Sequence, residues 1–438
     1  MDRFNRLPNL GHKHSAGARD GEDEHLLHST QAVILAGGRG ARLQQLTAWR
    51  AKPAVPFAGK LKIIDFALSN CINSGIRRVG VLTQYKAQSL IRHITRGWGF
   101  LDASLGEYVD VVPAQQKVDE GWYSGTANAV FQNLDMLREA SPRYVLVLAG
   151  DHVYKMDYGR MLSEHVARSA DISVACIEVP LTQASSFGVM RVGGDGRVLA
   201  FDEKPAQPQA LPYRPDAALA SMGIYIFEAE FLYRELQADA DDPTSTHDFG
   251  RDILPRVLAR SRVFAHDFAA SCVNMVGDRP YWRDVGTLDA YWEANIDLTM
   301  PLPDLNLYDE AWPIRSMQLQ LAPAKFVFDD DGRRGMAVDT LVSGGCIVSG
   351  ATVRRSVLFS ESRVDDGSLV EESLVLPGAR VGRNVVVRRA IIDKRCVLTD
   401  GMTIGVDPVA DRARFAVTEN GITLVTPEML GQRAHVPR

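Results

Sequence analysis

The chain has few cysteines, and they are widely scattered. Five cysteines occur in 438 residues, and none of them form a Cys-x-x-Cys spacing. An odd, scattered set offers neither a disulfide framework nor a zinc site, and it is typical of a reducing compartment.

Long apolar runs and an excess of basic charge are also missing. No stretch approaches the ~20 apolar residues that a membrane span needs, and residues 1–30 lack the apolar centre of a secretory signal peptide. The 49 Lys and Arg against 54 Asp and Glu give a net charge of -5. No global basic field therefore attracts nucleic acid or an acidic membrane. We expect a soluble, cytoplasmic protein with neither of these partners, in which any phosphate site is local.

Residues 33–43, VILAGGRGARL, form an apolar run that breaks into glycines. Glycine tolerates positive φ and lets a backbone approach a ligand without a Cβ clash. Successive backbone N–H groups form an anion-binding concavity. Arg39, Arg42, Arg50 and Lys52 place positive charge around the same turn. Together these features predict a cradle for a nucleotide triphosphate.

The glycines alone fit an ordinary strand-to-helix turn equally well. Residues 38–43 lack the third glycine of the dinucleotide fingerprint, and the Gly-Lys-Ser/Thr of a P-loop does not follow them. The phosphate interpretation depends on the glycines together with Arg42 and Lys52.

Short apolar segments alternate with helical patterns over the first 300 residues. In residues 126–137, Thr126 is a predicted N-cap and apolar residues recur at helical spacing. Such alternation predicts a doubly wound, mostly parallel sheet, with ligands bound outside the carboxyl ends of its strands. Gly37-Gly38 and Gly150-Asp151 fall at those ends. The expected strands are residues 32–35, 79–83, 144–148, 172–179, 222–227 and 263–268.

The C-terminal part has a period of its own. Aliphatic residues pair six apart, and the first members of successive pairs lie seventeen apart. A small or turn-forming residue follows each of them by three positions. This pattern is typical of a hexapeptide-type parallel β-helix with three sides to a coil. A small antiparallel sandwich is the alternative, but it needs hairpin signals that we do not find. The pairs are Ile347 and Val353, Val364 and Val370, Val381 and Val387, and Leu398 and Ile404.

The predicted domain organisation follows from these patterns. Residues 1–30 are a flexible tail, 31–300 an α/β domain, 301–335 a proline-rich linker, and 336–438 the β-helix. The exposed ends and faces of a β-helix need covering, so we expect a homo-oligomer.

Two short motifs resemble the signature of sugar-nucleotide pyrophosphorylases, G-G-x-G-x-R-L followed about ten residues later by K-P. They are residues 37–43 and Lys52-Pro53. The runs 50–56 (RAKPAVP), 63–70 (IIDFALSN) and 282–287 (WRDVGT) are similar to one branch, the glucose-1-phosphate adenylyltransferases of bacterial glycogen synthesis. The resemblance covers nearly the whole chain after about residue 30.

This resemblance implies a fold and an activity. The fold is a Rossmann-like nucleotidyltransferase domain followed by a left-handed β-helix. The activity is transfer of AMP from ATP to glucose 1-phosphate, with Mg²⁺ as cofactor. The resemblance further implies small-molecule allosteric effectors and a homotetramer.

Asp151 follows a predicted strand beside a glycine, where a carboxylate can hold a hard divalent cation. Asp284 is the candidate second carboxylate. Each alone fits a loop or cap aspartate, but both match metal-binding positions of the family. Arg42 and Lys52 are then implied as catalytic cations. We interpret His152 as structural, because the nucleophile is already an anionic phosphate oxygen and needs no base.

Residues 201–205 match the family's F-x-E-K-P motif. The resemblance implies that Lys204 binds the phosphate of glucose 1-phosphate and that Glu203 binds sugar hydroxyls. Without it, this segment fits a surface salt-bridge turn. Tyr123 is implied at the sugar phosphate, and Gly188 and Ser221 match sugar-site positions.

The nucleotide side of the expected site contains the glycine turn and a second group of residues. Its candidate members are Leu35, Ala36, Gly37, Gly38, Gln84, Gln115, Gly125 and Thr126.

Two positions depart from the family. Trp49 stands where members activated by fructose 1,6-bisphosphate carry a lysine, and an indole cannot neutralise a phosphate. Arg50 and Arg389 remain as candidate effector contacts, although a solvated charged face explains Arg389 equally well. Asn128 replaces a common aspartate, for which we have no account.

Other functions stay open at this point. One is a uridylyl- or thymidylyltransferase on the same scaffold, because base choice depends on a few loop contacts. Another is a non-catalytic regulatory subunit, against which the presence of Arg42, Lys52, Asp151 and Lys204 argues. A third adds an acyltransferase β-helix, which would want a histidine in the coils, yet none lies between Asp365 and Arg433.

Overall fold

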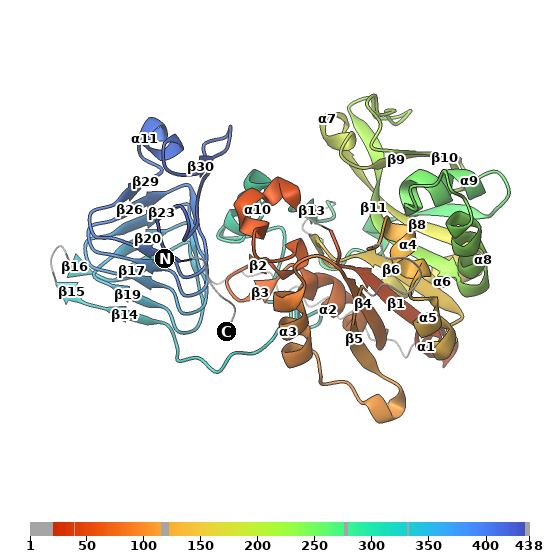
Figure 1. The fold of residues 1–438 in the computed structure, drawn as a ribbon, viewed down its shortest axis with the longest axis horizontal. Coiled ribbons are helices and arrows are strands. Elements are labelled where there is room, and N and C mark those ends of the chain that lie inside the picture. The colour runs from red at the N-terminus through yellow and green to blue at the C-terminus, as the bar shows by residue number, and fades with distance from the viewer. Residues whose placement is uncertain (1–20, 39, 115–121, 276–278, 331–332, 434–438) are drawn as a thin grey trace, which may run out of the picture.

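A computed structural model describes residues 21–38, 40–114, 122–275, 279–330 and 333–433, without the side chains of 21–23. An α/β domain lies beside a stack of short-stranded coils (Figure 1). Among the described helices, none is both long and apolar enough to cross a membrane.

A nine-stranded sheet forms the centre of the α/β domain. Its neighbours β6, β1, β4 and β5 run parallel. Strand β11 runs antiparallel to β6, β8 and β9, a reversal that the sequence did not predict. The strands are β1 (Thr30–Leu35), β4 (Arg78–Thr83), β5 (Tyr108–Pro113), β6 (Tyr144–Ala149), β8 (Ile172–Pro180), β9 (Gly188–Val192), β10 (Val198–Glu203), β11 (Ala217–Glu228) and β12 (Val263–Asp267).

Helices cover both faces of this sheet. On β1, Ala32 and Ile34 pack into one apolar cluster with α2, α3 and α6, whereas Val33 packs into another with α4, α5 and α8. Burial of alternate residues on opposite faces explains why such strands read as continuous apolar runs. The predicted doubly wound domain is confirmed. The helices are α2 (Ile64–Ser74), α3 (Gln88–Gly97), α4 (Thr126–Phe131), α5 (Leu134–Ala140), α6 (Tyr158–Ala167) and α8 (Ala229–Ala240).

Short elements connect these larger ones. Two small antiparallel pairs, β2 with β3 and β7 with β13, lie outside the main sheet. These elements are η1 (Ala41–Thr47), η2 (Lys52–Ala54), β2 (Pro56–Phe57), β3 (Leu61–Lys62), η3 (Ala103–Leu105), β7 (His152–Tyr154), α7 (Leu181–Ala184), η4 (Phe249–Ile253), α9 (Leu254–Val257), η5 (Phe268–Ala270), β13 (Trp282–Asp284) and α10 (Leu288–Asp297).

The structure differs from two local predictions. Helix α1 (Gly21–His28) lies inside the predicted flexible tail, where Leu27 packs into the core beneath the sheet. Thr126 is not an N-cap but the first residue of α4, and its hydroxyl donates to Asp248. The helical pattern that begins there also breaks at Asn133, so it forms two helices rather than one.

The C-terminal part is a β-helix with three sheets as its sides, which confirms the predicted class. Its first strand lies within the predicted linker. The first side contains β14 (Lys325–Val327), β19 (Ile347–Ser349), β22 (Arg363–Val364), β25 (Arg380–Val381) and β28 (Val397–Leu398). The second contains β17 (Met336–Val338), β20 (Thr352–Arg354), β23 (Leu369–Glu371), β26 (Val386–Arg388) and β29 (Thr403–Ile404). The third contains β18 (Leu341–Val342), β21 (Val357–Leu358), β24 (Leu374–Val375), β27 (Ala390–Ile392), β31 (Thr423–Val425) and β30 (Ala416–Val417). A two-stranded ribbon, β15 (Asp329–Asp330) and β16 (Arg333–Arg334), and α11 (Pro408–Arg412) lie outside the three sides.

The predicted inward positions are correct except in the first pair. Val348, not Ile347, stacks beneath Val364 and is fully buried. The first coil is one residue shorter than the seventeen-residue repeat. The prediction assumed a constant period, so it placed the inward residue one position too early. The corner prediction holds after the first member of each pair, where Gly350, Gly367, Asn384 and Gly401 have positive φ. After the second members of the first three pairs, positive φ falls one residue earlier than predicted, at Arg355, Glu372 and Arg389.

An apolar cluster and one buried ion pair join the β-helix to the α/β domain. Phe57 and Tyr291 of the first domain pack in the same cluster as Phe359 and Leu376 of the second. Both carboxylate oxygens of Asp393 accept hydrogen bonds from Arg50, at 2.6 and 2.7 Å. The pair is almost fully buried, so each charge depends on the other for compensation.

We expect Asp393→Asn to lower the free energy of unfolding by about 3–5 kcal/mol, because it leaves the Arg50 guanidinium buried without a counter-charge. Chemical denaturation measures this loss. The matched control is Asp365→Asn, which breaks a half-exposed pair with Arg363 in the same domain and should cost less than about 1 kcal/mol. Equal losses in the two variants would contradict the proposed importance of the buried pair.

Candidate active site

A large cavity lies at the carboxyl ends of β1, β4 and β6. The Gly150 N–H donates to the Leu35 carbonyl at 3.0 Å, and the Ala36 N–H donates to the Leu82 carbonyl at 2.9 Å. These bonds hold three strand ends together, so the loops after them open into one space. The cavity measures about 1180 Å³. Its position is the one expected for a ligand site in an open α/β sheet.

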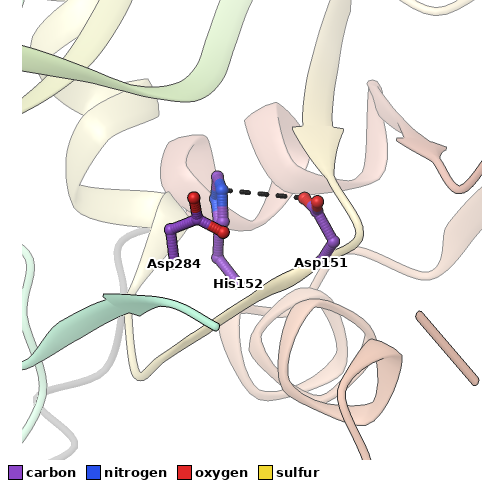
Figure 2. Close-up of side chains that lie close together, drawn as sticks. All are labelled: Asp151, His152 and Asp284. Carbon is purple, nitrogen blue, oxygen red and sulfur yellow. Dashed lines mark ion pairs between the residues drawn. The ribbon is translucent and has the colours of Figure 1, made fainter. Parts of the chain in front are cut away.

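Two aspartates meet on one wall of this cavity. Asp151 lies in the turn after β6, immediately before β7. Strand β13 pairs antiparallel with β7 and places Asp284 directly opposite His152. Side chains opposite one another in an antiparallel pair lie on the same face. The β7–β13 pair therefore puts Asp284 on the same face as His152. Asp151, in the turn just before β7, lies close to both, so the two predicted metal-binding carboxylates come together (Figure 2).

Lys52 lies between the two carboxylates. Its ammonium donates to Asp151 Oδ2 at 2.9 Å and to Asp284 Oδ1 at 2.6 Å, while Arg42 donates to Asp284 Oδ2 at 3.2 Å. Burial alone would raise the pKa of both carboxyl groups, but the Lys52 charge holds each pKa below its ordinary value. Burial would lower the pKa of Lys52, and the two carboxylates raise it instead. All three groups are therefore charged at neutral pH.

The donor set on this wall suits a divalent cation. Within the part of the chain that the structure describes, Asp151, His152 and Asp284 are the group whose ligand atoms all lie within 4.8 Å of one another. Two carboxylates with space for phosphate oxygens and water are what Mg²⁺ requires in proteins.

The predicted sugar-site residues line the same cavity. Lys204 has positive φ, and its ammonium donates to Glu203 Oε1 at 2.6 Å. A Cβ at Gly188 would lie 2.4 Å from the Phe201 ring, so only glycine fits beside it. Ser221 and Tyr123 also line the space, and the Tyr123 hydroxyl accepts a hydrogen bond from Asn133 at 2.9 Å.

Most of the predicted nucleotide-side residues line the cavity too, although the glycines act differently from the prediction. The positive φ in the turn belongs to Gly40, not to Gly37 or Gly38. A Cβ on Gly38 would contact no described protein atom within 4 Å, so packing does not explain that glycine. The members on the cavity wall are Leu35, Gly37, Gly38, Gln84, Gly125 and Thr126.

Three predicted residues among those described are not on the cavity wall. Ala36 is buried beneath it. Gln115 lies outside the described residues. Arg50 is held by Asp393 at the domain junction, and Arg389 lies over the Trp292 ring at 4.9 Å. The two candidate effector residues therefore have partners within the chain.

The segment around η4 also lines the cavity, although the sequence did not predict it. Asp248 caps η4 and accepts the Thr126 hydroxyl at 3.0 Å, and both Asp248 and Gly250 line the cavity. A Cβ at Gly250 would lie 2.5 Å from a Glu203 carboxylate oxygen. The only sequence signal was an aspartate two residues before a glycine, which is common in turns. Lys86 was also missed, and it adds a fourth cation to the wall after Arg42, Lys52 and Lys204.

Comparison with known proteins agrees with this geometry. The nucleotidyl transferase family model matches residues 31–300, and a GlmU-like C-terminal hexapeptide model matches residues 322–425. The chain is 62% identical over 407 residues to the glucose-1-phosphate adenylyltransferase of Nitrosospira multiformis, covering 93% of this chain and 96% of that protein. It is 60% identical over 415 residues to the enzyme of that name from Nitrosomonas europaea, covering 94% and 96%. The chain therefore belongs to the glucose-1-phosphate adenylyltransferase family of nucleotidyltransferases.

Proposed function

We propose that this chain transfers AMP from ATP to glucose 1-phosphate, giving ADP-glucose and pyrophosphate, the activated-sugar step of glycogen and related α-glucan synthesis. Membership of the family supports the reaction. The observation that carries the residue assignment is the content of one cavity. It holds the two acids with Lys52 and Arg42, and it also holds Glu203 with Lys204.

In this reaction an oxygen of the sugar phosphate attacks the α-phosphorus of ATP. The bond from that phosphorus to the β-phosphate oxygen breaks, and pyrophosphate leaves with the electron pair. The nucleophile and the triphosphate are both anions that repel each other. The main tasks of the protein are therefore to hold them in line and to offset their charge.

Arg42 and Lys52 are assigned to the triphosphate. Both lie on short helical segments beside the glycine turn, η1 and η2. Lys52 is only 5% exposed, so its ammonium acts in a nearly dry site where charge counts for more than in water. Its two carboxylate partners keep it protonated before the substrate arrives.

Lys204 and Glu203 are assigned to glucose 1-phosphate. The lysine side chain is 58% exposed, so it can turn from Glu203 towards an incoming phosphate. An ammonium is a compact phosphate partner, and a carboxylate accepts hydrogen bonds from sugar hydroxyls. Their mutual pair in the free protein keeps both charges satisfied until the sugar phosphate binds.

Nucleotidyltransferases of this family generally use a divalent metal, and we infer that it is Mg²⁺ on Asp151 and Asp284. Such a cation, when bound, neutralises charge that develops on the phosphates. Lys52 already holds both carboxylates. Asp151 and Asp284 would hold the cation, and it would compete with Lys52 for their oxygens, so that Lys52 could turn towards the phosphates.

We further propose that small anionic effectors bind at the domain junction and that the chain forms a homotetramer. Burial lowers the pKa of Lys62 to about 7 and of Lys394 to about 8, and the charges of Lys394 and Arg50 add to the shifts. Such crowding of cations favours an anion. Arg50 at the junction and Lys52 in the cavity are two residues apart, so one short segment contacts both places.

We expect Asp151→Asn to lower kcat by about 10²–10³-fold with little change in the KM for glucose 1-phosphate, because it removes charge stabilisation needed in the transition state. Steady-state pyrophosphate release measures both constants. Asp102→Asn, an exposed cap distant from the cavity lining, is the control. A kcat within a few-fold of the unmodified protein would contradict the assignment.

Lys204→Ala should act on the other substrate. We expect the KM for glucose 1-phosphate to rise by more than kcat falls, while the KM for ATP stays within about two-fold.

The same assay with ATP, UTP and dTTP tests the choice of nucleotide. Faster turnover with UTP or dTTP than with ATP would overturn the adenylyl assignment.

Binding of an anion at the domain junction can be tested with sulfate, which does not itself take up or release protons near neutral pH. Because both lysines have lowered pKa values, a bound anion should raise them and draw protons onto the protein at pH 8. At pH 6 both are already charged, so no uptake is expected. Calorimetry in buffers of different ionisation enthalpy measures the uptake. Lys394→Gln should reduce it, and unchanged uptake in that variant would place the anion elsewhere.

A further inference from the structure

His152 lies on the cavity wall beside the two aspartates, although the sequence analysis assigned it no role in the chemistry. It is the first residue of β7, directly opposite Asp284, and it lies on the same wall as the two acids. Its Nε2 lies 3.6 Å from Asp151 Oδ1, beyond hydrogen-bond length but facing the carboxylate (Figure 2). One atom of each of the three side chains falls within 4.8 Å of the others.

The protein holds the imidazole ring in this orientation. Trp282, two residues before Asp284 on β13, packs edge-on against the ring, with centroids 4.9 Å apart and planes at 69°. Phe187 packs in turn on Trp282 at 5.2 Å. Gly223 also lies beside the ring, because a Cβ built there would be in ordinary van der Waals contact with its Cε1, at 3.9 Å. The side chain is only 13% exposed, so little freedom remains.

The two ring nitrogens have different surroundings. Nδ1 is buried and has no hydrogen-bond partner within the described part of the chain. Nε2 faces the acids on the cavity side. A purely structural histidine satisfies its buried nitrogens with protein partners, as His266 does through Glu164 at Nδ1 and Ser271 at Nε2. The polar edge of His152 is instead directed to the place where the acids converge.

We propose that His152 Nε2 is a third protein ligand of a divalent cation held by Asp151 and Asp284, so that the site binds Mn²⁺ more tightly than Mg²⁺. The inference rests on the proposed function for the location of the metal. Imidazole suits transition-metal ions, whereas Mg²⁺ strongly prefers oxygen. Two carboxylates and one imidazole therefore form a set in which Mg²⁺ uses the oxygens alone and Mn²⁺ gains the nitrogen.

The test uses Mn²⁺ with ATP bound to the full chain, observed by electron spin-echo envelope modulation. Two preparations are compared, one with ordinary histidine and one with ¹⁵N-histidine. We expect the signal of a directly bound nitrogen to change from ¹⁴N to ¹⁵N with the label. The adenine nitrogens of ATP are not labelled, so they cannot produce this change. Because the protein carries no substitution, a loss of folding cannot explain the result.

His152→Gln should then abolish the histidine signal and weaken Mn²⁺ binding by at least about 10-fold, with a smaller effect on Mg²⁺. His28→Gln, an exposed change on α1, should alter neither. Absence of a label-dependent signal in Mn²⁺ bound to the unmodified chain would overturn the inference. If Asp151→Asn leaves the bound Mn²⁺ unchanged, the metal site of the proposed function fails instead.

Discussion

The nearly buried ammonium of Lys52, held between two carboxylates, is the interaction on which the site depends. It joins three segments that are far apart in the chain: the turn after β6, strand β13 and helix η2. Charges this poorly exposed are costly unless they are paired, so each group stabilises the position of the other two. The same arrangement places two carboxylates and a cation together on the cavity wall, where we propose that a phosphate and a metal bind.

A second buried pair follows the same principle at the domain junction. Arg50 and Asp393 join the β-helix to the α/β domain within a shared apolar cluster. Arg50 and Lys52 belong to one short, buried segment that continues through Pro53. The segment that pairs with the β-helix therefore also carries Lys52, the cation that we propose for catalysis. If an anion binds at the junction, as we propose, this continuity would link it to the cavity.

The two sides of the cavity differ in how their polar groups are arranged. On the proposed nucleotide side, the nearly buried Lys52 is held between two acids, beside the glycine turn. On the sugar side, an exposed lysine pairs with its own neighbour, Glu203, and glycines 188 and 250 make space for that carboxylate. The first side is preorganised for charge, whereas the second is free to rearrange around a sugar. That division fits a reaction in which positioning and neutralisation supply most of the catalysis.

The sequence by itself determined the fold class and the family, and most of the residues that it predicted for the site do line the cavity. Apolar runs, the seventeen-residue period and the glycine–arginine–lysine signature are local patterns, and local patterns can be read from one chain. Asp284 was paired with Asp151 only through its motif. The two residues are far apart in the chain, so their sequence positions alone do not show that they lie close together.

Only the tertiary structure decided the features that depend on contact between distant segments. It placed Val348 rather than Ile347 inside the first coil, because inter-coil pairing sets that register. It added Asp248 and Gly250 to the site, engaged Arg50 in a buried pair, and directed His152 towards the acids. Each outcome depends on which segments pack together, and the energy of such packing does not appear in the order of residues along the chain.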